Sequence, residues 1–416
     1  MSENDGAAGL DCVVVGGGPG GMVLAHLLAR AGLRVTLLEG HRDFDRDFRG
    51  DSLHPYTLEL MDTLGLADGL LALPHFKATR FRAHTMAGSI VLADYERVRS
   101  PYPYVAIMPQ VRFLDFLAER SAALPGFTLI TGARVRELVI EDGRVVGVRW
   151  REGQQTRELR ARVVVGCDGR FSKLRALAEV PVTDLGAASD LLWFRLPREP
   201  GDPPEADIDL YFGPRNYVGM LGGISDWQIG YTLPKGGFPA AREAGVEPIR
   251  EFLRSYVGWL EDRIELLAGF DQTTLLSVEL KRVERWWRPG LLLIGDAAHV
   301  ISPVGGNGIL MAIQDAVAAT NRLVPALRSA RTGATDVPDG VLAAVQADRE
   351  PAVREVQADQ VSVERRAKRA REAGRELIPG RLLKVVTALP GVKARGARSN
   401  SYGPNPPRLD TDLLTA

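Results

Sequence analysis

The sequence predicts an α/β protein that combines a parallel sheet with a second, mostly antiparallel sheet. Three features of the 416-residue chain predict this class. An apolar strand, a glycine cluster and a helix follow one another at the start; buried-strand patterns return near positions 165 and 295; and short strands separated by Gly/Pro turns occupy residues 182–277. We therefore expect the segments of the two sheets to be interleaved along the chain.

The N-terminal segment has the pattern of a strand–helix–strand unit. Residues 10–15 are apolar, residues 20–31 place apolar side chains at helical spacing, and residues 33–38 repeat the strand pattern. Parallel neighbours need such a crossover connection between them. We therefore expect the two strands to be adjacent and parallel.

The rest of the chain carries further expected elements. Helices are expected at 57–66, 113–123, 248–256 and 309–323, and strands within 78–94 and at 162–165, 191–196, 208–212, 217–221, 227–233 and 291–294. Residues 134–149 predict a hairpin that turns at Glu141-Asp142-Gly143. Residues 340–376 predict a charged helix interrupted at Pro351, and the polar tail from Gly396 is expected to be mobile or to lie on the surface.

These patterns divide the chain into three parts. Residues 1–74, 106–181 and 278–330 are expected to form a discontinuous nucleotide-binding domain. Residues 75–105 and 182–277 are expected to form a β domain that binds the substrate, and residues 331–416 a C-terminal helical segment with a tail.

Composition argues against several classes of protein. Lys+Arg 52 balance Asp+Glu 52, which argues against a nucleic-acid partner. Cys12 and Cys167 lie in apolar strand patterns, and neither they nor the six histidines have the spacing of a metal site. There is no basic leader and no apolar run of about 18 residues. We expect a cytoplasmic protein with no metal and no membrane span, acting as a monomer or homodimer.

The first motif is a glycine run between the first strand and the first helix. It consists of Gly16, Gly18, Pro19, Gly20 and Gly21, with Gly17 between them, and matches G-x-G-x-x-G. In this pattern the glycines allow a tight turn, a close approach of the backbone to a pyrophosphate, and close packing of helix on strand. Glu39 ends the second strand, where a carboxylate can bind the hydroxyls of an adenosine ribose. The run therefore predicts a dinucleotide site.

Two further motifs follow buried strands. Gly295-Asp296 ends the 291–294 strand, and the turn 302–308 after it is rich in glycine and opens a helix. The carboxylate can bind a sugar-alcohol hydroxyl, and the helix N-terminus favours an electron-rich group. Asp168-Gly169 follows the 162–165 strand and extends to Ser172 and Arg175, which a simple turn does not require.

With these three motifs in this order, about the first 330 residues resemble a known family. The chain is similar to the single-component (group A) FAD-dependent monooxygenases, aromatic hydroxylases of the p-hydroxybenzoate hydroxylase fold. The resemblance implies a Rossmann-like FAD-binding domain with an interleaved substrate domain, non-covalent FAD, and NAD(P)H as a transient co-substrate. A second G-x-G-x-x-G unit, which a dedicated NAD(P)H domain would need, is absent from the sequence.

The resemblance also implies roles for individual residues. Gly16, Gly18, Gly21 and Glu39 would hold the ADP half of FAD, and Asp296 its ribityl chain. Arg49 would lie near the flavin and the nicotinamide, Asp168 would support both indirectly, and Pro303 would lie where oxygen reacts. The remaining cofactor contacts would be Pro19, Gly20, Gln110, Gly295, Gly305, Gly306, Asn307 and Gly308.

The strand region that would cover the substrate offers several polar side chains. A tyrosine there could deprotonate or orient a phenol, although tyrosines in strands also pack well. The candidate substrate contacts are Tyr211, Arg215, Tyr217 and Arg195, and the candidate catalytic residues are Arg49, Pro303 and Tyr217.

The resemblance implies a reaction as well. NAD(P)H would reduce FAD, dioxygen would add to give the flavin C4a-hydroperoxide, and one oxygen atom would pass to an aromatic or polycyclic small molecule by hydroxylation or epoxidation. Two alternatives stay open from the sequence. One is an FAD-dependent reductase or dehydrogenase of the same fold, and the other is a flavin-bound protein that binds a ligand without converting it.

Overall fold

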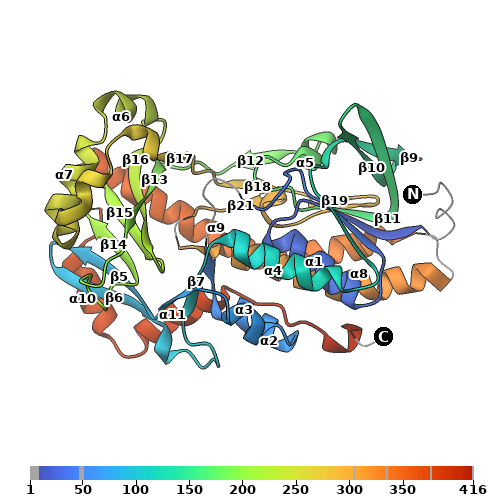
Figure 1. Ribbon diagram of the computed structural model, residues 1–416, viewed down its shortest axis with the longest axis horizontal. Coiled ribbons are helices and arrows are strands. Elements are labelled where there is room, and N and C mark those ends of the chain that lie inside the picture. Colours follow the sequence, from blue (N-terminus) through green and yellow to red (C-terminus); the bar gives the residue numbers. More distant parts are fainter. Residues whose placement is uncertain (1–8, 46–50, 304, 333–335, 375–376, 415–416) are drawn as a thin grey trace.

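The computed structural model describes residues 9–45, 51–303, 305–332, 336–374 and 377–414. Figure 1 shows two β-rich parts side by side, one built on a twisted parallel sheet packed against long helices and the other on an antiparallel sheet. The chain passes between the two parts several times, which agrees with the interleaving expected from the sequence.

The parallel sheet has the expected strand–helix–strand unit at its centre. Its strands, in spatial order, are β19 (Trp287–Arg288), β20 (Leu291–Leu293), β11 (Gln155–Gly166), β1 (Leu10–Val15), β2 (Val35–Leu38) and β8 (Phe127–Ile130). All pairs except β19–β20 are parallel. Cys12 and Val14 pack on one face and Val13 and Val15 on the other. Both faces are buried, which explains why these strands are apolar without alternation.

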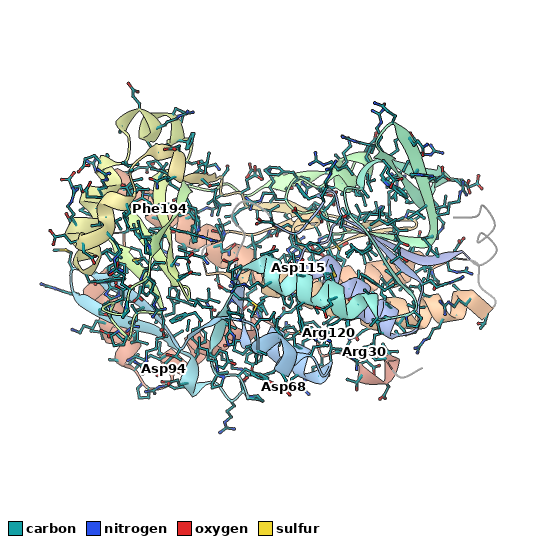
Figure 2. All side chains as sticks on the ribbon, viewed as in Figure 1. Arg30, Asp68, Asp94, Asp115, Arg120 and Phe194 are labelled. Atoms are coloured by element: carbon teal, nitrogen blue, oxygen red, sulfur yellow. The ribbon has the colours of Figure 1, made fainter. Side chains whose placement is uncertain are left out.

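Helices cover one face of this sheet. They are α1 (Pro19–Arg30), α2 (Pro55–Thr63), α4 (Gln110–Ala122) and α8 (Asn307–Thr332), whose buried apolar side chains form one core with the sheet. Arg30 and Arg120 mark the ends of α1 and α4 in Figure 2, and the Arg30 guanidinium donates to the Leu64 carbonyl at 2.6 Å. This bond ties α1 to the end of α2.

A β-hairpin lies on the other face. Strands β9 (Arg134–Glu141) and β10 (Arg144–Glu152) turn at Asp142 and Gly143, which both have positive φ, of 47° and 78°. Such a pair is typical of a type I′ hairpin turn, and the expected turn is confirmed. Strand β11 is much longer than the four residues expected, because its first half pairs with β10 and only its second half joins the parallel sheet.

The second sheet contains the short strands of the middle of the chain. Its spatial order is β17 (Thr274–Leu276), β13 (Ser189–Pro197), β16 (Asp226–Pro234), β15 (Tyr217–Gly222), β14 (Ile208–Phe212), β5 (Arg80–Thr85) and β6 (Gly88–Asp94). All neighbours are antiparallel except β14 and β5. Helix α7 (Glu247–Tyr256) packs on one face of this sheet, so the opposite face is available to line a site.

Shorter elements connect the two parts. Two small sheets consist of β3 (Ser52–Leu53), β7 (Val105–Ile107) and β4 (Phe76–Ala78), and of β12 (Val182–Asp184), β18 (Lys281–Val283) and β21 (His299–Val300). The short helices are α3 (Ala67–Leu71), α5 (Lys173–Leu177) and α6 (Phe238–Ala244).

The expected interruption at Pro351 is wrong. Helix α9 (Asp339–Glu372) runs through this residue without a break. A proline removes one helical hydrogen bond, but Arg349, Ala352 and Val353 beside it are buried against the rest of the protein. Tertiary packing on both sides of Pro351 therefore outweighs the local loss. Near its end, α9 reaches the second sheet, where the Arg371 guanidinium donates to Ser189 Oγ at 3.0 Å.

The expectation of a tail from Gly396 is wrong as far as Tyr402. Helices α10 (Gly380–Ala388) and α11 (Val392–Tyr402) precede the tail, and the Tyr402 hydroxyl donates to Glu59 at 2.6 Å. Beyond them the chain lies on the surface, where the Pro407 carbonyl accepts a hydrogen bond from the Tyr56 hydroxyl at 2.7 Å. Among the described helices, none combines the length and the apolar character that a bilayer span requires.

Candidate active site

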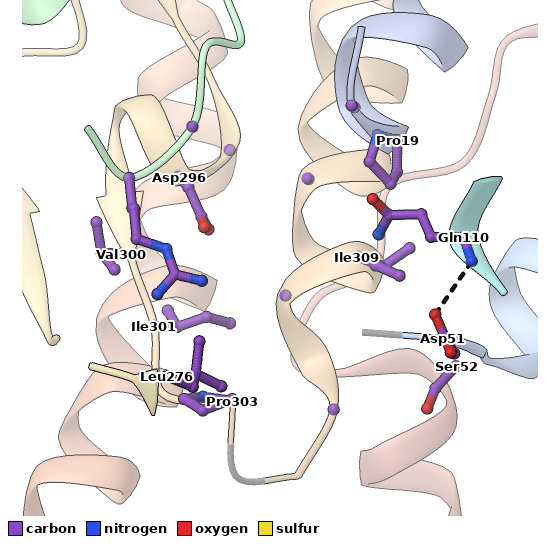
Figure 3. A pocket seen from close by; sticks show the side chains of 18 of the residues that line it. Pro19, Asp51, Ser52, Gln110, Leu276, Asp296, Val300, Ile301, Pro303 and Ile309 are labelled. Atoms are coloured by element: carbon purple, nitrogen blue, oxygen red, sulfur yellow. Dashed lines mark hydrogen bonds between the residues drawn. The ribbon is translucent and has the colours of Figure 1, made fainter. Parts of the chain in front are cut away.

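A cavity of about 800 Å³ lies between the carboxyl ends of the parallel strands and the antiparallel sheet. Ligand pockets of proteins usually measure about 300–1,000 Å³. Figure 3 shows part of it, with Pro19 and Gln110 on one side and Asp296 on the other. The predicted cofactor residues that line it are Gly16, Gly18, Pro19, Gly20, Gly21, Glu39, Gln110, Asp168, Gly295, Asp296, Pro303, Gly305, Gly306 and Gly308. Asn307 begins α8 between two of them, and Arg49 lies outside the described residues.

The glycine run serves packing at two positions and leaves space at a third. A Cβ atom at Gly16 would lie 2.4 Å from the Cys167 carbonyl oxygen, and one at Gly21 would lie 2.0 Å from the Gly16 carbonyl oxygen. A Cβ at Gly18 would meet no atom within 4 Å. Helix α1 has no side-chain cap and no acidic residue in its first turn. Its N-terminus can therefore accept an anionic group such as a pyrophosphate.

Glu39 is held rigidly at the edge of the cavity. Its side chain is buried and accepts hydrogen bonds from the backbone N–H groups of Gly17 and His41, each at 2.8 Å. The His41 ring also lies 2.9 Å from Glu39. Glu39 therefore ties the glycine run to the end of β2 at the edge of the cavity.

The Asp168-Gly169 motif shapes the next loop. One Asp168 oxygen accepts from the Ser172 hydroxyl at 2.5 Å, and the other accepts from the Lys173 backbone N–H at 2.6 Å. The Arg175 guanidinium donates to the carbonyls of Ala297 at 2.9 Å and Arg170 at 2.7 Å. Asp168 therefore caps α5, and Arg175 fastens this loop to the Gly295-Asp296 loop.

Replacing Arg175 tests whether this link supports the cofactor. We expect Arg175→Lys to fold but to bind FAD about tenfold more weakly, because an ammonium group cannot bridge two carbonyls as the planar guanidinium does. Fluorescence titration of the apoprotein with FAD measures the effect. Arg157→Lys, at an exposed position on β11, is the control. Equal affinities of the two variants would contradict the expectation.

A buried ion network supports the Gly295-Asp296 loop from below. Asp315 on α8 accepts from the Gly295 backbone N–H at 2.9 Å, from His299 Nε2 at 2.6 Å and from Arg349 Nε at 2.9 Å. Burial alone would raise the pKa of Asp315, but the charges and hydrogen bonds of His299 and Arg349 outweigh it and hold the pKa below its ordinary value. His299 thus has a structural partner, and the network holds Asp296 at the cavity.

The glycine-rich turn before α8 lies on the same side. Gly305 and Gly306 adopt φ values of +94° and +69°, which favour glycine, and a ring nitrogen of His54 lies 3.3 Å from the Gly306 carbonyl oxygen. The first turn of α8 carries no acidic residue. Asn307 Oδ1 is buried with no hydrogen-bond partner among the described residues. A bound molecule with a donor group fits this position.

Asp51 is a buried carboxyl group in the cavity that the sequence did not single out. Its Oδ1 accepts from the Gln110 backbone N–H at 3.1 Å (Figure 3), and its Oδ2 accepts from Gln228 Nε2 at 2.6 Å. Burial is the largest effect and raises its pKa from 3.8 to about 6, while the hydrogen bonds from Gln228 and Gln110 oppose it. Asp51 is therefore ionised at pH 8, and its ionisation lowers the free energy of unfolding of the protein.

This shift predicts a pH-dependent stability. Since the folded pKa is raised, the stabilisation from neutral Asp51 is complete below pH 3.8 and is lost as the pH rises through about 6. About 1 kcal/mol of this loss falls between pH 5 and pH 8. Urea unfolding of Asp51→Asn and of the parent protein, both saturated with FAD, measures it. The stability of the variant relative to the parent should rise with pH over this range; a constant difference would contradict the shift.

Of the four candidate substrate residues, Tyr217 lines the cavity. Burial raises the pKa of its hydroxyl, so this side chain can donate a hydrogen bond at neutral pH but is not a base. Residues of β14 alternate, and Leu210 faces the cavity. Tyr211 therefore faces the core beneath α7, where its ring stacks on His84 with centroids 4.2 Å apart.

The two arginines differ in their places relative to the cavity. Arg215 is exposed in the β14–β15 turn, and its carbonyl accepts from Arg371 at 2.8 Å. Arg195 lies on the same face of β13 as the cavity residues Leu191 and Trp193. Its half-exposed side chain pairs with Asp226 at 3.7 Å and lies 4.0 Å from Asp51. Tyr211 and Arg215 therefore lie away from the cavity, whereas Arg195 borders it. Their roles as substrate contacts stay predictions. Alternation along the strands predicts which side chains share a face of the sheet. It does not predict which of the two faces borders the cavity.

Comparison with known proteins relates this chain to an FAD-binding family and to monooxygenases. The model of a family described as "FAD binding domain" matches residues 10–357. The 6-methylpretetramide 4-monooxygenase of Streptomyces rimosus is 38% identical over 344 residues, which cover 82% of this chain and 80% of that protein. Rifampicin monooxygenase of Streptomyces venezuelae is 29% identical over 357 residues, 83% of this chain and 69% of that protein.

Solved structures show the same fold. The structure of PqsL, described as a probable FAD-dependent monooxygenase from Pseudomonas aeruginosa, has a TM-score of 0.74 at 23% identity and covers 88% of this chain and 99% of its own. The α/β fold expected from the sequence is thereby confirmed. Because the family model spans most of the chain and a 38% identical relative aligns with most of its length, this protein belongs to the FAD-dependent monooxygenases built on this FAD-binding domain.

Proposed function

We propose that this monooxygenase uses NAD(P)H and dioxygen to hydroxylate or epoxidise a planar aromatic or polycyclic small molecule. The proposal is carried by the extent of the cavity. The cavity continues from the three motifs to an apolar face of the antiparallel sheet. The side chains on that face are Phe81, Leu191, Trp193, Ile208, Leu210 and Leu221.

The names of two relatives support this substrate class and the electron donor. The 6-methylpretetramide 4-monooxygenase acts on the compound in its name, and a protein of Rhodococcus jostii is named a probable NADH-specific resorcinol 4-hydroxylase. The latter is 28% identical and covers 84% of this chain and 64% of its own length. Since NAD(P)H is a cytoplasmic metabolite, we place the reaction in the cytoplasm.

Residues from the three motifs would hold FAD along the cavity. Gly18 and the α1 N-terminus would receive the pyrophosphate, Glu39 the ribose hydroxyls, and Asp296 the ribityl hydroxyls. Pro303 and residues 305–308 would lie against the flavin ring, with the α8 N-terminus stabilising negative charge on it. When bound, FAD supplies the redox chemistry, accepting a hydride from NAD(P)H and reacting with dioxygen.

The other half of the cavity would hold the substrate and exclude water. Trp193 and Leu210 offer apolar contacts to a ring system, and Tyr217 can donate a hydrogen bond to it. Proximity and the exclusion of water are what an oxygen transfer to an activated ring needs, and it requires no acid–base pair.

The test is turnover against a panel of substrates. NAD(P)H oxidation is followed in air with phenols, naphthalenediols and polycyclic polyketides, and products are weighed by mass spectrometry under ¹⁸O₂. We expect one class to stimulate oxidation and to gain one labelled oxygen atom. A product that has only gained or lost hydrogen would favour a reductase or dehydrogenase, and no stimulation by any compound would favour a protein that only binds its ligand.

A further inference from the structure

Asp51 and Gln228 form a buried polar pair in the cavity, next to the apolar side chains of the antiparallel sheet. Asp51 is 5% exposed and Gln228 3%, and both line the cavity. They come from different parts of the fold, since Asp51 precedes β3 and Gln228 lies on β16. The pair therefore stands where the cofactor side of the cavity meets the face of the antiparallel sheet.

The hydrogen bonds of this pair leave one acceptor without a donor. Both oxygens of Asp51 are occupied, by the Gln110 backbone N–H and by Gln228 Nε2. An ionised carboxylate only accepts hydrogen bonds, so the amide of Gln228 must direct its NH₂ group to Asp51. Gln228 Oε1 is then turned away from Asp51, and it is buried with no partner among the described residues. Buried polar atoms in native proteins nearly always have a partner.

The walls around Gln228 suit a flat molecule. Gly219 and Gly230 are paired across β15 and β16, and both line the cavity. A Cβ atom at Gly230 would lie 2.5 Å from Cζ3 of Trp193, so this indole ring lies directly against the Gly230 backbone. A planar ring system can therefore lie on this surface with one edge at Gln228.

We propose that Gln228, oriented by Asp51, recognises the substrate by accepting a hydrogen bond from a phenolic or enolic hydroxyl at the edge of a planar polycyclic ring. The inference rests on the proposed function and adds to it the group that is recognised. Gln228 is the contact residue, and Asp51 is a positioning residue that acts through it. Arg195 lies 4.0 Å from Asp51 Oδ2 and supports its ionised form.

Binding to the oxidised, FAD-loaded enzyme at pH 8 tests this with two probes. Naphthalene-1,3-diol carries the hydroxyl donor, and 1,3-dimethoxynaphthalene has the same rings without it. Perturbation of the flavin spectrum gives both Kd values without turnover. We expect the parent enzyme to bind the diol about tenfold more tightly than the diether, and Gln228→Met, which keeps the side chain's length, to bind the two about equally.

Asp51→Asn tests the positioning role. A neutral amide can donate or accept, so it no longer dictates which way Gln228 points. We expect the preference for the diol to fall to between one- and threefold, with the flavin content unchanged. Gln346→Leu on α9, outside the cavity, is the control and should keep the full preference.

Each result decides a different part. If Gln228→Met keeps a tenfold preference, or if the parent binds both probes equally, the recognition by Gln228 is wrong while the proposed function stands. If Gln228→Met loses the preference and Asp51→Asn keeps it, only the positioning role is wrong. If neither probe nor any phenol of the turnover panel perturbs the flavin of the parent enzyme, the proposed substrate class fails, and this recognition fails with it.

Discussion

Gly18→Ala is expected to leave the protein folded and to weaken FAD binding about a hundredfold, or about 3 kcal/mol. The added methyl group meets no protein atom within 4 Å, and the φ of −72° at Gly18 suits alanine. The methyl group would instead occupy the space in which we propose that the pyrophosphate lies against the α1 N-terminus. Fluorescence titration of the apoprotein with FAD measures the loss, and thermal unfolding of the apoprotein checks the fold.

Gly340→Ala provides the matched control. Gly340 also lies at the start of a helix, α9, and a Cβ there also meets no atom within 4 Å. This variant should bind FAD like the parent protein. Equal FAD affinities of Gly18→Ala and Gly340→Ala would contradict the proposed pyrophosphate position. The methyl group at position 18 would then not lie in the space that FAD occupies.

Arg349→Met is expected to lower the free energy of unfolding by about 3–5 kcal/mol, because it leaves the Asp315 carboxylate buried without its cation. Arg349 and Asp315 are both fully buried, and the pair joins α9 to α8. The variant should also lose FAD more readily, since Asp315 accepts a hydrogen bond from Gly295 in the loop that we propose holds the ribityl chain. Urea unfolding with excess FAD measures the first effect, and FAD retention on gel filtration the second.

A second ion pair between the same two helices serves as the control. Arg322 on α8 pairs with Asp348 on α9 at 2.8 Å, but both side chains are largely exposed to water. Arg322→Met should cost only about 0–1 kcal/mol, since solvent screens the pair. If the two arginine variants lost the same stability, burial would not be what gives the Asp315 network its importance.

The side of the cavity lined by the three motifs could largely be predicted from the sequence. A tight turn, a close approach of the backbone and a carboxylate at a strand end each require particular residue types at fixed spacing, as at Gly16, Gly21 and Glu39. Because parallel strands end on the same edge of their sheet, motifs far apart in the chain converge there. In the structure, the three motifs lie together at this edge of the sheet.

The substrate side could not be predicted in the same way. Alternation along β14 separates Leu210 from Tyr211, but the sequence does not say which side chain faces the cavity. The packing of α7 on one face of the sheet decides it and turns Tyr211 into the core. The helix that ends at Tyr402 could not be predicted either, because its sequence has a weak helix propensity. Tertiary contacts such as that of Tyr402 with Glu59 stabilise it.

The sequence by itself determined the fold class, the order of the strands along the chain and the three motif loops that meet at the cavity. These depend on local periodicity and on backbone conformations that few residues allow. Only the tertiary structure decided which polar groups share the cavity. Asp51 and Gln228 are 177 residues apart and carry no motif, and their hydrogen bond exists because two sheets meet there. The same holds for Arg349 and Asp315, whose pairing requires α9 to pack on α8 and so bury both charges.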